Sequence, residues 1–321
     1  MVEPVRALVV SWNGAHLLPS CLSSLEQQTV RDRMEVVVVD NASTDGTEDL
    51  MARRHPAVRV IRSAVNLGFA GGAELGMRDA PGHVVLLNND ARFAPDAVER
   101  LLDALDGFPR AGAVTAKILL ADPSGGEPRW VNSTGNVVTT RGAGGDRDWM
   151  RPRGQESTER TVFGFCGGAA LLRREALDDV GGFDPSLFLY YEDTDLSWRM
   201  RAAGWEVVHE PAAVAVHQHA ASSGTDSPLF RYHNTRNSLV VVTRHAPARV
   251  VLRSVVRQSA GAVRAVLRAG TSSAVARARL RALRDYALRL PRTLRERRAL
   301  WRNAAVDRAS VARHLSPPGG D

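Results

Sequence analysis

The chain has 321 residues, of which 44% are hydrophobic and 24% are charged, a balance that excludes general disorder and allows one large core with a helical extension. Two cysteines, Cys21 and Cys166, exclude a disulfide framework and a CxxC metal site, and they fit a reducing compartment. No run of about 18 or more apolar residues and no signal-peptide pattern occurs, so we expect neither a membrane-spanning helix nor a secretory leader.

Charge divides the chain into an acidic body and a basic C-terminal part. From Arg231 onward there are 20 arginines and 4 acidic residues, a net charge of +16. Since the whole chain carries +7, residues 1–230 carry −9. A basic part of this kind requires an anionic partner or a solvated surface.

The first 120 residues alternate short apolar runs with helical patterns. Strands are predicted at 6–11, 35–40, 58–62, 83–87 and 113–120, and helices at 17–27, 47–54, 72–78 and 95–105. Strands that alternate with helices predict the α/β class, with a mostly parallel central sheet and helices on both faces.

The rest of the chain changes character twice. Residues 121–160 are rich in Gly, Pro, Arg and Asp, which predicts a long loop with a small hairpin near 130–140. Order is predicted to return at 163–177, with a helix at 196–203 and short strands at 206–209 and 213–217. From residue 229 the pattern is helical, and Pro247 and Pro291 are predicted to interrupt it.

Polar side chains follow three predicted strands at the point where each strand ends. They are Ser11 and Asn13 after the first strand, Asp40, Asn41 and Ser43 after the second, and Asn88, Asn89 and Asp90 after the fourth. Ligands of open α/β sheets bind beyond such strand ends, so we expect a binding rim, although turn residues are the alternative. Asp90 suits a hard divalent cation that bridges the phosphates of a nucleotide diphosphate, and it is too far from the helix at 95–105 to cap it directly.

A second group of chemically active side chains lies near residue 193. Glu192, Asp193 and Asp195 are three carboxylates within four positions, and crowding raises the pKa of one of them, which suits a general base. Asp195 is alternatively a favourable charge at a helix N-terminus. His217 follows an apolar run and is a candidate metal ligand or an ordinary core or surface histidine.

Several motifs occur in a fixed order over residues 5–245. They are SWNG, VVVVDNASTDGT, NLGFAGG, LLNND, FCGGAALL, GGFD, YYEDTDLSWR and AVHQHAASS. Together they resemble the family 2 glycosyltransferases of the Rossmann-like A-type nucleotide-sugar fold, and most of all the bacterial rhamnosyltransferase-like branch. The resemblance implies a catalytic domain at 1–245, with a nucleotide-sugar half at 1–120 and an acceptor half at 121–245. The composition of the remainder predicts a basic helical tail at 246–321.

The resemblance also implies site residues. Nucleotide-sugar binding is expected of Ser11, Asn13, Asp40, Asn41, Ser43, Asn66, Gly68, Asn89 and Asp90. The acceptor side is expected to include Gly167, Gly168, Asp195, Trp198 and Arg199. Asp193 matches the catalytic base of the ED motif, with Glu192 beside it. Asp90 matches the last acid of the DxD motif, and Asn88 stands where that motif has its first acid. The resemblance also implies that His217 completes the coordination sphere of an Mg²⁺ or Mn²⁺ ion.

The implied reaction is a single inverting displacement. Asp193 takes the proton of an acceptor hydroxyl, which attacks the anomeric carbon as the nucleotide diphosphate leaves. The implied donor is dTDP-rhamnose, with UDP-galactofuranose and UDP-N-acetylglucosamine as alternatives, and the acceptor is a glycan or polyprenyl-linked glycan of the cell envelope. A nucleotidyltransferase would require a Gly-rich basic phosphate loop, which SWNG lacks, and a non-catalytic scaffold would not require the Glu192–Asp193 pair.

The basic tail intersperses arginine with Val, Leu and Ala at near-helical spacing. This pattern favours an amphipathic helix on anionic lipid, which predicts a cytoplasmic enzyme that is peripheral at the inner face of the plasma membrane. A helical pair packed on the catalytic domain is the alternative. We expect no nucleic-acid partner, because no recognition motif or aromatic platform accompanies the arginines.

Overall fold

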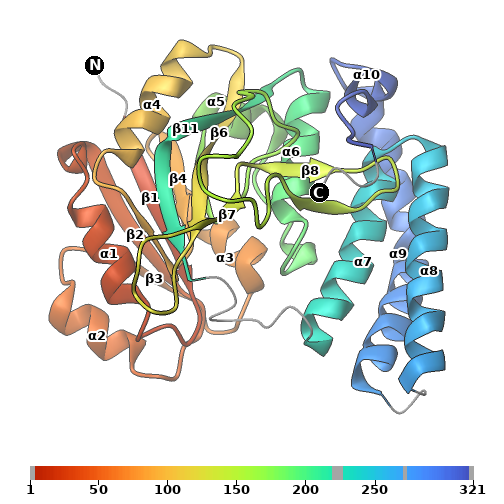
Figure 1. Cartoon of the computed structure of the whole chain (residues 1–321), viewed down its shortest axis with the longest axis horizontal. Helices are drawn as coiled ribbons and strands as arrows, with labels where there is room; N and C mark the ends of the chain where they lie inside the picture. Colours follow the sequence, from red (N-terminus) through yellow and green to blue (C-terminus); the bar gives the residue numbers. More distant parts are fainter. Residues whose placement is uncertain (1–3, 219–226, 270–272, 318–321) are drawn as a thin grey trace.

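The computed structural model describes residues 4–218, 227–269 and 273–317, and a large central sheet organises them (Figure 1). In the described residues this sheet has nine strands, in the order β3-β2-β1-β4-β10-β6-β11-β5, with β7 beside β6. The strands are β1 (Val5–Ser11), β2 (Met34–Asp40), β3 (Arg59–Arg62), β4 (His83–Leu87), β5 (Ala91–Phe93), β6 (Ala111–Leu120), β7 (Trp130–Ser133), β10 (Ala169–Leu172) and β11 (Glu206–His217). A second sheet pairs β8 (Asn136–Val138) with β9 (Gly144–Asp146).

Among the residues described, the large sheet is mixed: six of its nine strands point the same way, but four of its eight pairings are antiparallel. β3, β2, β1 and β4 pair in parallel, and so do β6 and β11. β10 runs antiparallel to both β4 and β6, so β4 and β6 point the same way. The strands β3, β2, β1, β4, β6 and β11 therefore share one direction, and β10 runs opposite to them. The β1–β2 register places Ser11 opposite Asp40, which brings two of the predicted polar strand ends to one edge.

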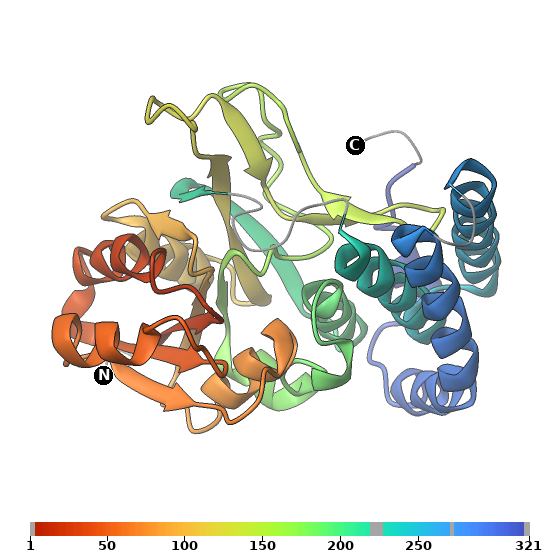
Figure 2. The same cartoon turned by 90° about the horizontal axis from the view of Figure 1, so that it is seen from below.

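Helices cover both faces of the sheet (Figure 2). One face carries α1 (Leu18–Glu26), α2 (Thr47–Arg54) and α4 (Ala97–Gly107), and the other carries α3 (Gly68–Met77), α5 (Arg174–Val180) and α6 (Glu192–Ala202). The central strands are therefore buried on both sides, which explains their continuous runs of Val and Leu.

Two strand predictions in the second half are wrong. The segment near 130–140 does not form a hairpin with itself, because β7 pairs with β6 and β8 pairs with β9. Between them, Gly135 adopts a φ of +116° and its N–H donates to the Ser133 hydroxyl, which turns the chain out of the large sheet. The two short strands predicted at 206–217 are one strand, β11, and its register shift beside Pro211 accommodates the missing proline N–H.

The C-terminal part is helical. It contains α7 (Pro228–His245), α8 (Ala248–Ala269), α9 (Ala274–Arg302) and α10 (Arg308–Ala312). Pro247 separates α7 from α8 as predicted, but Pro291 lies inside α9 and does not end it. Pro291 lies on the exposed side of α9. Elsewhere α9 packs along α7, and the hydroxyl groups of Tyr286 and Thr243 are hydrogen-bonded at 2.8 Å. This packing outweighs the loss of the helical hydrogen bond that proline, without an N–H, cannot donate. None of the described helices combines the length and apolar composition needed to cross a bilayer.

A buried arginine joins these helices to the α/β core. Arg244 of α7 contacts Asp195 of α6 at 2.6 Å, Asp184 at 2.9 Å and Glu296 of α9 at 2.8 Å. Asp195 has no solvent exposure and also pairs with Arg199 at 3.0 Å. Burial by itself would raise the pKa of Asp195, but Arg244 and Arg199 hold it well below the ordinary value. Asp195 is therefore ionised, and the ion pairs fix α6 to α7 and α9.

Replacing Arg244 by Met should destabilise the protein strongly, since the buried Asp195 charge would lose its main partner. We expect the free energy of unfolding to fall by about 3–5 kcal/mol, measured by urea denaturation followed by circular dichroism. Arg292→Met is the matched control, because Arg292 also binds Glu296, at 2.7 Å, but its side chain is 65% exposed. That control should cost less than about 1 kcal/mol. Equal losses in the two variants would contradict the assignment.

Candidate active site

The ends of β1 and β2 are bonded to each other. The Asn41 N–H donates to the Ser11 carbonyl at 2.8 Å, and the Asn13 N–H donates to the Ser43 hydroxyl at 2.9 Å. In return, the Thr44 N–H donates to the Asn13 side-chain carbonyl at 2.8 Å. The structure thus brings four predicted nucleotide-sugar residues together on one rim, at the carboxyl ends of the strands.

Asp40 and Asn41 organise this rim from within. The Asn41 amide donates to Asn66 Oδ1 and to the Gly68 carbonyl, both at 3.0 Å, and so links the end of β2 to the start of α3. Asp40 is only 2% exposed, and Arg62 lies 3.4 Å from its carboxylate. Asn66, Gly68, Asp40 and Asn41 therefore form one connected wall.

Asn89 connects the end of β4 to the same rim. Its amide donates to the Ser11 hydroxyl at 3.1 Å. A Cβ on Gly14 would lie 2.4 Å from Asn89 Nδ2 and 2.6 Å from Ser11 Oγ, so a side chain there would displace these two groups. The glycine of SWNG therefore leaves room for the hydrogen bond between Asn89 and Ser11.

Asp90 and His217 form a polar pair beyond β4 and β11. His217 Nε2 lies 2.9 Å from Asp90 Oδ1, and His217 Nδ1 lies 2.6 Å from Asn132 Oδ1. The side chains of Asp90 and His217 are 5% and 13% exposed. The hydrogen bond to Asn132 on β7 thus fixes the orientation of the imidazole ring. Metal-binding histidines are usually oriented by such a bond to their second ring nitrogen.

The Asp90–His217 pair offers one carboxylate and one imidazole to a cation. No group of three or more Asp, Glu, His or Cys suited to a metal occurs in the part of the chain that the structure describes. Mg²⁺ usually keeps several waters and binds through one or two carboxylates plus substrate phosphates. The pair therefore fits a cation that takes most of its ligands from a bound diphosphate. The rest of the AVHQHAASS motif, from residue 219, lies outside the described residues.

Asp193 lies in the first turn of α6. The Gly167 N–H donates to its Oδ2 at 3.1 Å and the Thr194 N–H donates to its Oδ1 at 2.6 Å. Burial nevertheless raises the pKa of Asp193 above the ordinary value of an aspartate. Tyr190 and Tyr191, just before it, adopt φ angles of +68° and +72°, strained conformations of the sort often found at functional sites. A fixed carboxylate with a raised pKa is suited to accept a proton.

Glu192 differs from its neighbour. It is buried, and its Oε2 has no hydrogen-bond partner among the described residues. Burial, and then the charge of Asp193, raises the pKa of Glu192 well above the ordinary value. The two adjacent acids are thus in different electrostatic states, with Glu192 held toward its neutral form.

Two predicted acceptor-side residues form a turn between the two polar groups. The Gly168 carbonyl accepts the Asn88 N–H at 2.9 Å, and the next residue back, Gly167, binds Asp193 through its N–H. A Cβ on Gly168 would lie 3.4 Å from Asn88 Nδ2. The glycine turn therefore links the end of β4, and with it the Asp90 side, to the carboxylate of Asp193.

Three other acceptor-side predictions need correction. Asp195 is fully buried in the ion-pair network, and Trp198, 1% exposed, packs edge-on against Phe163. Arg199 donates to the backbone carbonyls of residues 180, 181 and 182. These side chains hold α6 against its neighbours instead of lining an open surface, because the helical period turns them away from Asp193.

Two polar residues of this region were missed in the sequence. Asn132 and Asp146 lie in the segment that the composition predicts to be a loop, where each stands beside other polar or charged residues. Burial raises the pKa of Asp146 to about 6, and the negative charge of Asp193 acts in the same direction. No pattern of spacing or composition identified either residue.

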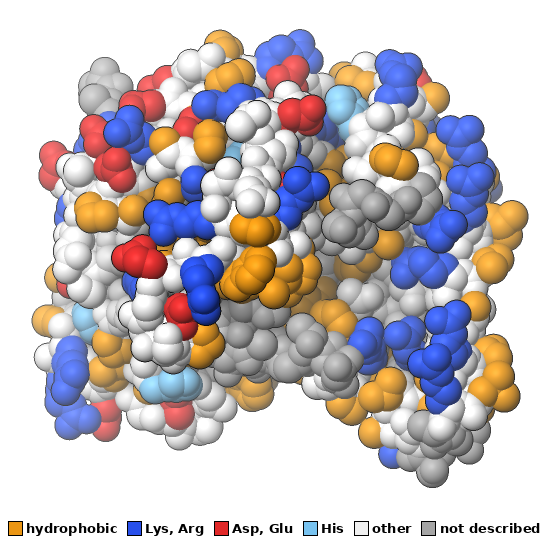
Figure 3. Space-filling view, in the orientation of Figure 1, with side chains coloured by type: hydrophobic (Ala, Val, Ile, Leu, Met, Phe, Trp, Pro, Cys, Tyr) orange, Lys and Arg blue, Asp and Glu red, His pale blue; other side chains and the backbone are white. Residues whose placement is uncertain are grey.

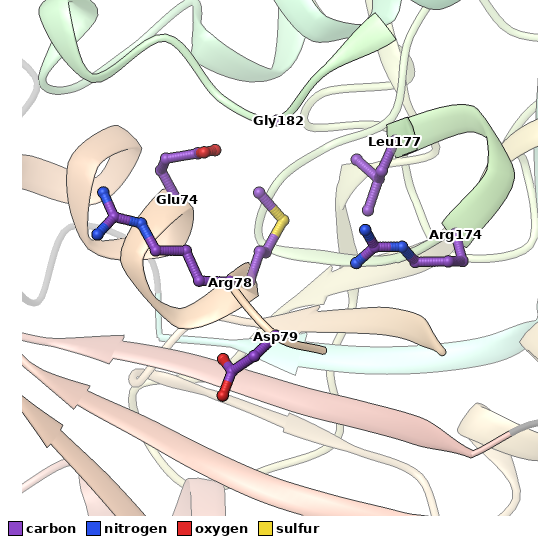
Figure 4. A pocket seen from close by; sticks show the side chains of 7 residues that line it. Glu74, Arg78, Asp79, Arg174, Leu177 and Gly182 are labelled. Atoms are coloured by element: carbon purple, nitrogen blue, oxygen red, sulfur yellow. The ribbon is translucent and has the colours of Figure 1, made fainter. Parts of the chain in front are cut away.

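A cavity of about 150 Å³ lies at the opposite edge of the sheet (Figure 4). It is lined by Glu74, Met77, Arg78, Asp79, Arg174, Leu177 and Gly182. Arg6, near the start of β1, donates to the Arg78 carbonyl at 2.7 Å, which places this cavity at the amino ends of the parallel strands. It is therefore separate from the rim and from Asp193.

Comparison with known sequences identifies relatives of this chain. The model of the family "Glycosyl transferase family 2" matches residues 7–181. An N-acetylglucosaminyl-diphospho-decaprenol L-rhamnosyltransferase of Mycobacterium tuberculosis is 34% identical over 281 residues, which is 79% of this chain and 90% of that protein. A poly-beta-1,6-N-acetyl-D-glucosamine synthase of Staphylococcus epidermidis is 24% identical over 216 residues, covering 66% of this chain and 49% of the synthase.

Solved structures share the fold at lower identity. The mannosyltransferase PcManGT from Pyrobaculum calidifontis, in complex with GDP-Man and Mn²⁺, superposes with a TM-score of 0.55 at 20% identity, over 94% of this chain and 85% of its own. GalNAc-T7 with UDP, GalNAc and Mn²⁺ has a TM-score of 0.60 at 14% identity, over 90% of this chain and 57% of its own. Both likenesses support the expected fold.

Proposed function

This chain belongs to glycosyl transferase family 2 and is a glycosyltransferase, and on that premise we propose that it transfers L-rhamnose from dTDP-rhamnose. The proposed acceptor is a glycan or a polyprenyl-linked glycan in the synthesis of cell-envelope polysaccharide. The similarity to the mycobacterial L-rhamnosyltransferase supports both choices. UDP-galactofuranose and UDP-N-acetylglucosamine are the competing donors.

The observation that carries the proposed mechanism is the fixed carboxylate of Asp193. Its two oxygens accept N–H bonds from Gly167 and Thr194, which leaves lone pairs for the proton of an acceptor hydroxyl. As Asp193 takes that proton, the hydroxyl oxygen bonds to the anomeric carbon. The bond from that carbon to the diphosphate oxygen breaks with its electron pair, and the configuration inverts.

The donor is proposed to bind at the rim formed by the ends of β1, β2 and β4. Ser11, Asn13, Ser43 and Asn89 supply neutral donors and acceptors for the nucleoside and the sugar. Asp90 and His217 would hold Mg²⁺ or Mn²⁺. When bound, such an ion neutralises the charge of the diphosphate leaving group.

Donor choice can be measured by titration calorimetry of the purified protein with dTDP-rhamnose, UDP-galactofuranose and UDP-N-acetylglucosamine. We expect dTDP-rhamnose to bind most tightly, and only when Mg²⁺ or Mn²⁺ is present. Asp90→Asn should weaken that binding at least about tenfold, because the cation would lose its charged ligand. Tighter binding of a UDP-sugar would reject the rhamnose donor, and binding that is independent of the ion would reject the cation role.

Asp193→Asn should lower the rate of transfer by about 10²- to 10⁴-fold, since the amide cannot accept the proton. Donor affinity, measured by calorimetry, should stay within about twofold of the wild type and serves as the control for folding. Because burial raises the pKa of Asp193, wild-type activity should fall as the pH drops through a value above that of an ordinary aspartate. Full activity of the variant would favour another base or a scaffold role.

We propose that residues 246–321 hold the catalytic domain, residues 1–245, at the cytoplasmic face of the plasma membrane. Within this tail, α8 lies at the outer edge of the molecule, and Figure 3 shows arginine side chains gathered along it. α8 has no acidic residue. Its inward side is formed by buried residues such as Val250 and Ala262, which pack toward the other helices.

The outward face of α8 exposes apolar side chains at helical spacing. They are Leu252, Val256, Val263 and Leu267, with exposures of 65%, 59%, 58% and 81%. The exposed arginines of the same helix are Arg249, Arg253, Arg264 and Arg268. Exposed apolar side chains beside cations match the chemistry of an anionic lipid surface, with apolar groups in the acyl boundary and guanidinium groups at the phosphates.

The double variant Leu252→Gln/Leu267→Gln should reduce binding to vesicles that contain phosphatidylglycerol by at least about tenfold, because it removes the two most exposed apolar anchors. Co-sedimentation measures the bound fraction, and high salt should weaken it. Val65→Gln, with a 60% exposed side chain in the other half of the protein, is the control and should bind as the wild type does. No binding by the wild type, or a dimer formed through α8, would contradict the proposal.

A further inference from the structure

The hairpin of β8 and β9 is hydrogen-bonded to two segments next to Asp193, the one that leads to Gly167 and the one that precedes α6. Asp146 ends β9 and lies opposite Asn136 of β8. Asn136 exchanges two backbone bonds with Gly164, at 2.6 and 3.1 Å, and Gly164 begins the segment that leads to Gly167. The Gly144 N–H donates to the hydroxyl of Tyr191, just before the Glu192–Asp193 pair, at 2.9 Å. The position of Asp146 relative to Asp193 is thus fixed from two directions.

The carboxylate of Asp146 is incompletely satisfied. Its side chain bonds Ser133 and Cys166, and it lies close enough to Asp193 and His217 for their charges to act on it. Its Oδ1 atom is buried and has no hydrogen-bond partner in the described part of the chain. A buried carboxylate oxygen without a partner is costly, and a bound hydroxyl group beside Asp193 would supply the missing donor.

We propose that Asp146 accepts a hydrogen bond from a hydroxyl group of the acceptor sugar. The inference rests on the proposed function and names a specificity residue for it. A carboxylate binds hydroxyl groups well and repels phosphate, so Asp146 selects the sugar part of the acceptor. The donor rim is built from the ends of β1, β2 and β4, whereas Asp146 belongs to the second sheet and is fastened to the Asp193 side.

Asp148, two residues further on, is the matched control. Asp148 is buried, and both of its oxygens are bonded: Thr134 donates to it at 2.6 Å, the Ser157 N–H at 3.0 Å, and Arg151 lies at 3.2 Å. Asp148 thus holds the segment together, while Asp146 has a free acceptor atom. The same Asp→Asn change should act on stability at one position and on substrate binding at the other.

The experiment compares Asp146→Asn, Asp146→Ala and Asp148→Asn with the wild type. The acceptor is a soluble short-chain analogue of N-acetylglucosaminyl-diphospho-decaprenol, the substrate in the name of the mycobacterial relative. We expect both Asp146 variants to raise the acceptor KM at least about tenfold, with donor Kd within about twofold of the wild type and an unchanged or higher Tm. Asp148→Asn should lower the Tm and leave the acceptor KM unchanged.

Three outcomes would overturn this assignment. An unchanged acceptor KM in both Asp146 variants would exclude acceptor binding by this side chain. A loss of donor affinity without a rise in the acceptor KM would exclude it as well. A fall in Tm that matches that of Asp148→Asn, without a change in the acceptor KM, would make Asp146 a structural residue. Wild-type turnover of this acceptor tests the proposed function separately, since the Asp146 result is a ratio between variant and wild type.

Discussion

A charge buried beside the catalytic helix constrains the architecture of this enzyme. Asp195 is ionised without solvent exposure, a state that is tolerable only because Arg199, Arg244 and His245 surround it. Those partners come from α6 itself and from the end of α7, and Arg244 continues to Glu296 of α9. The helix that begins with Glu192 and Asp193 is therefore held by ion pairs to the C-terminal helices as well as by its packing on the sheet.

The site divides into two halves that meet at a turn of small residues. On one side, neutral amides and hydroxyls at the ends of β1, β2 and β4 form a rim that suits a nucleotide sugar. On the other side lie the carboxylates of Asp193, at the start of α6, and of Asp146, at the end of β9. Gly167 and Gly168 connect the halves: the Gly167 N–H donates to the Asp193 carboxylate, and the Gly168 carbonyl accepts the Asn88 N–H. Neither residue has a side chain that would occupy the space between the halves.

Local patterns predicted the parallel sheet and the rim because each depends on neighbours in the sequence: apolar runs, turn residues and the motifs at strand ends. The failures concern partners far along the chain. β7 pairs with the preceding strand β6 instead of with β8, and packing against α7 carries α9 past Pro291. Trp198 is expected in the site because it belongs to the motif YYEDTDLSWR, yet the helical period turns it inward. Asp146 gave no local signal, since a second hairpin brings it to Asp193.

The order of the strands also has a consequence for biosynthesis. β10 is inserted between β4 and β6, although it follows both in the chain. Until residues 169–172 have left the ribosome, the edge of β4 that β10 later covers has open backbone N–H and C=O groups, on a strand made of Val and Leu. Such an apolar edge is a template for pairing between nascent chains. The N-terminal half therefore exposes this edge during translation until β10 pairs with β4, and β11 adds to β6 later still.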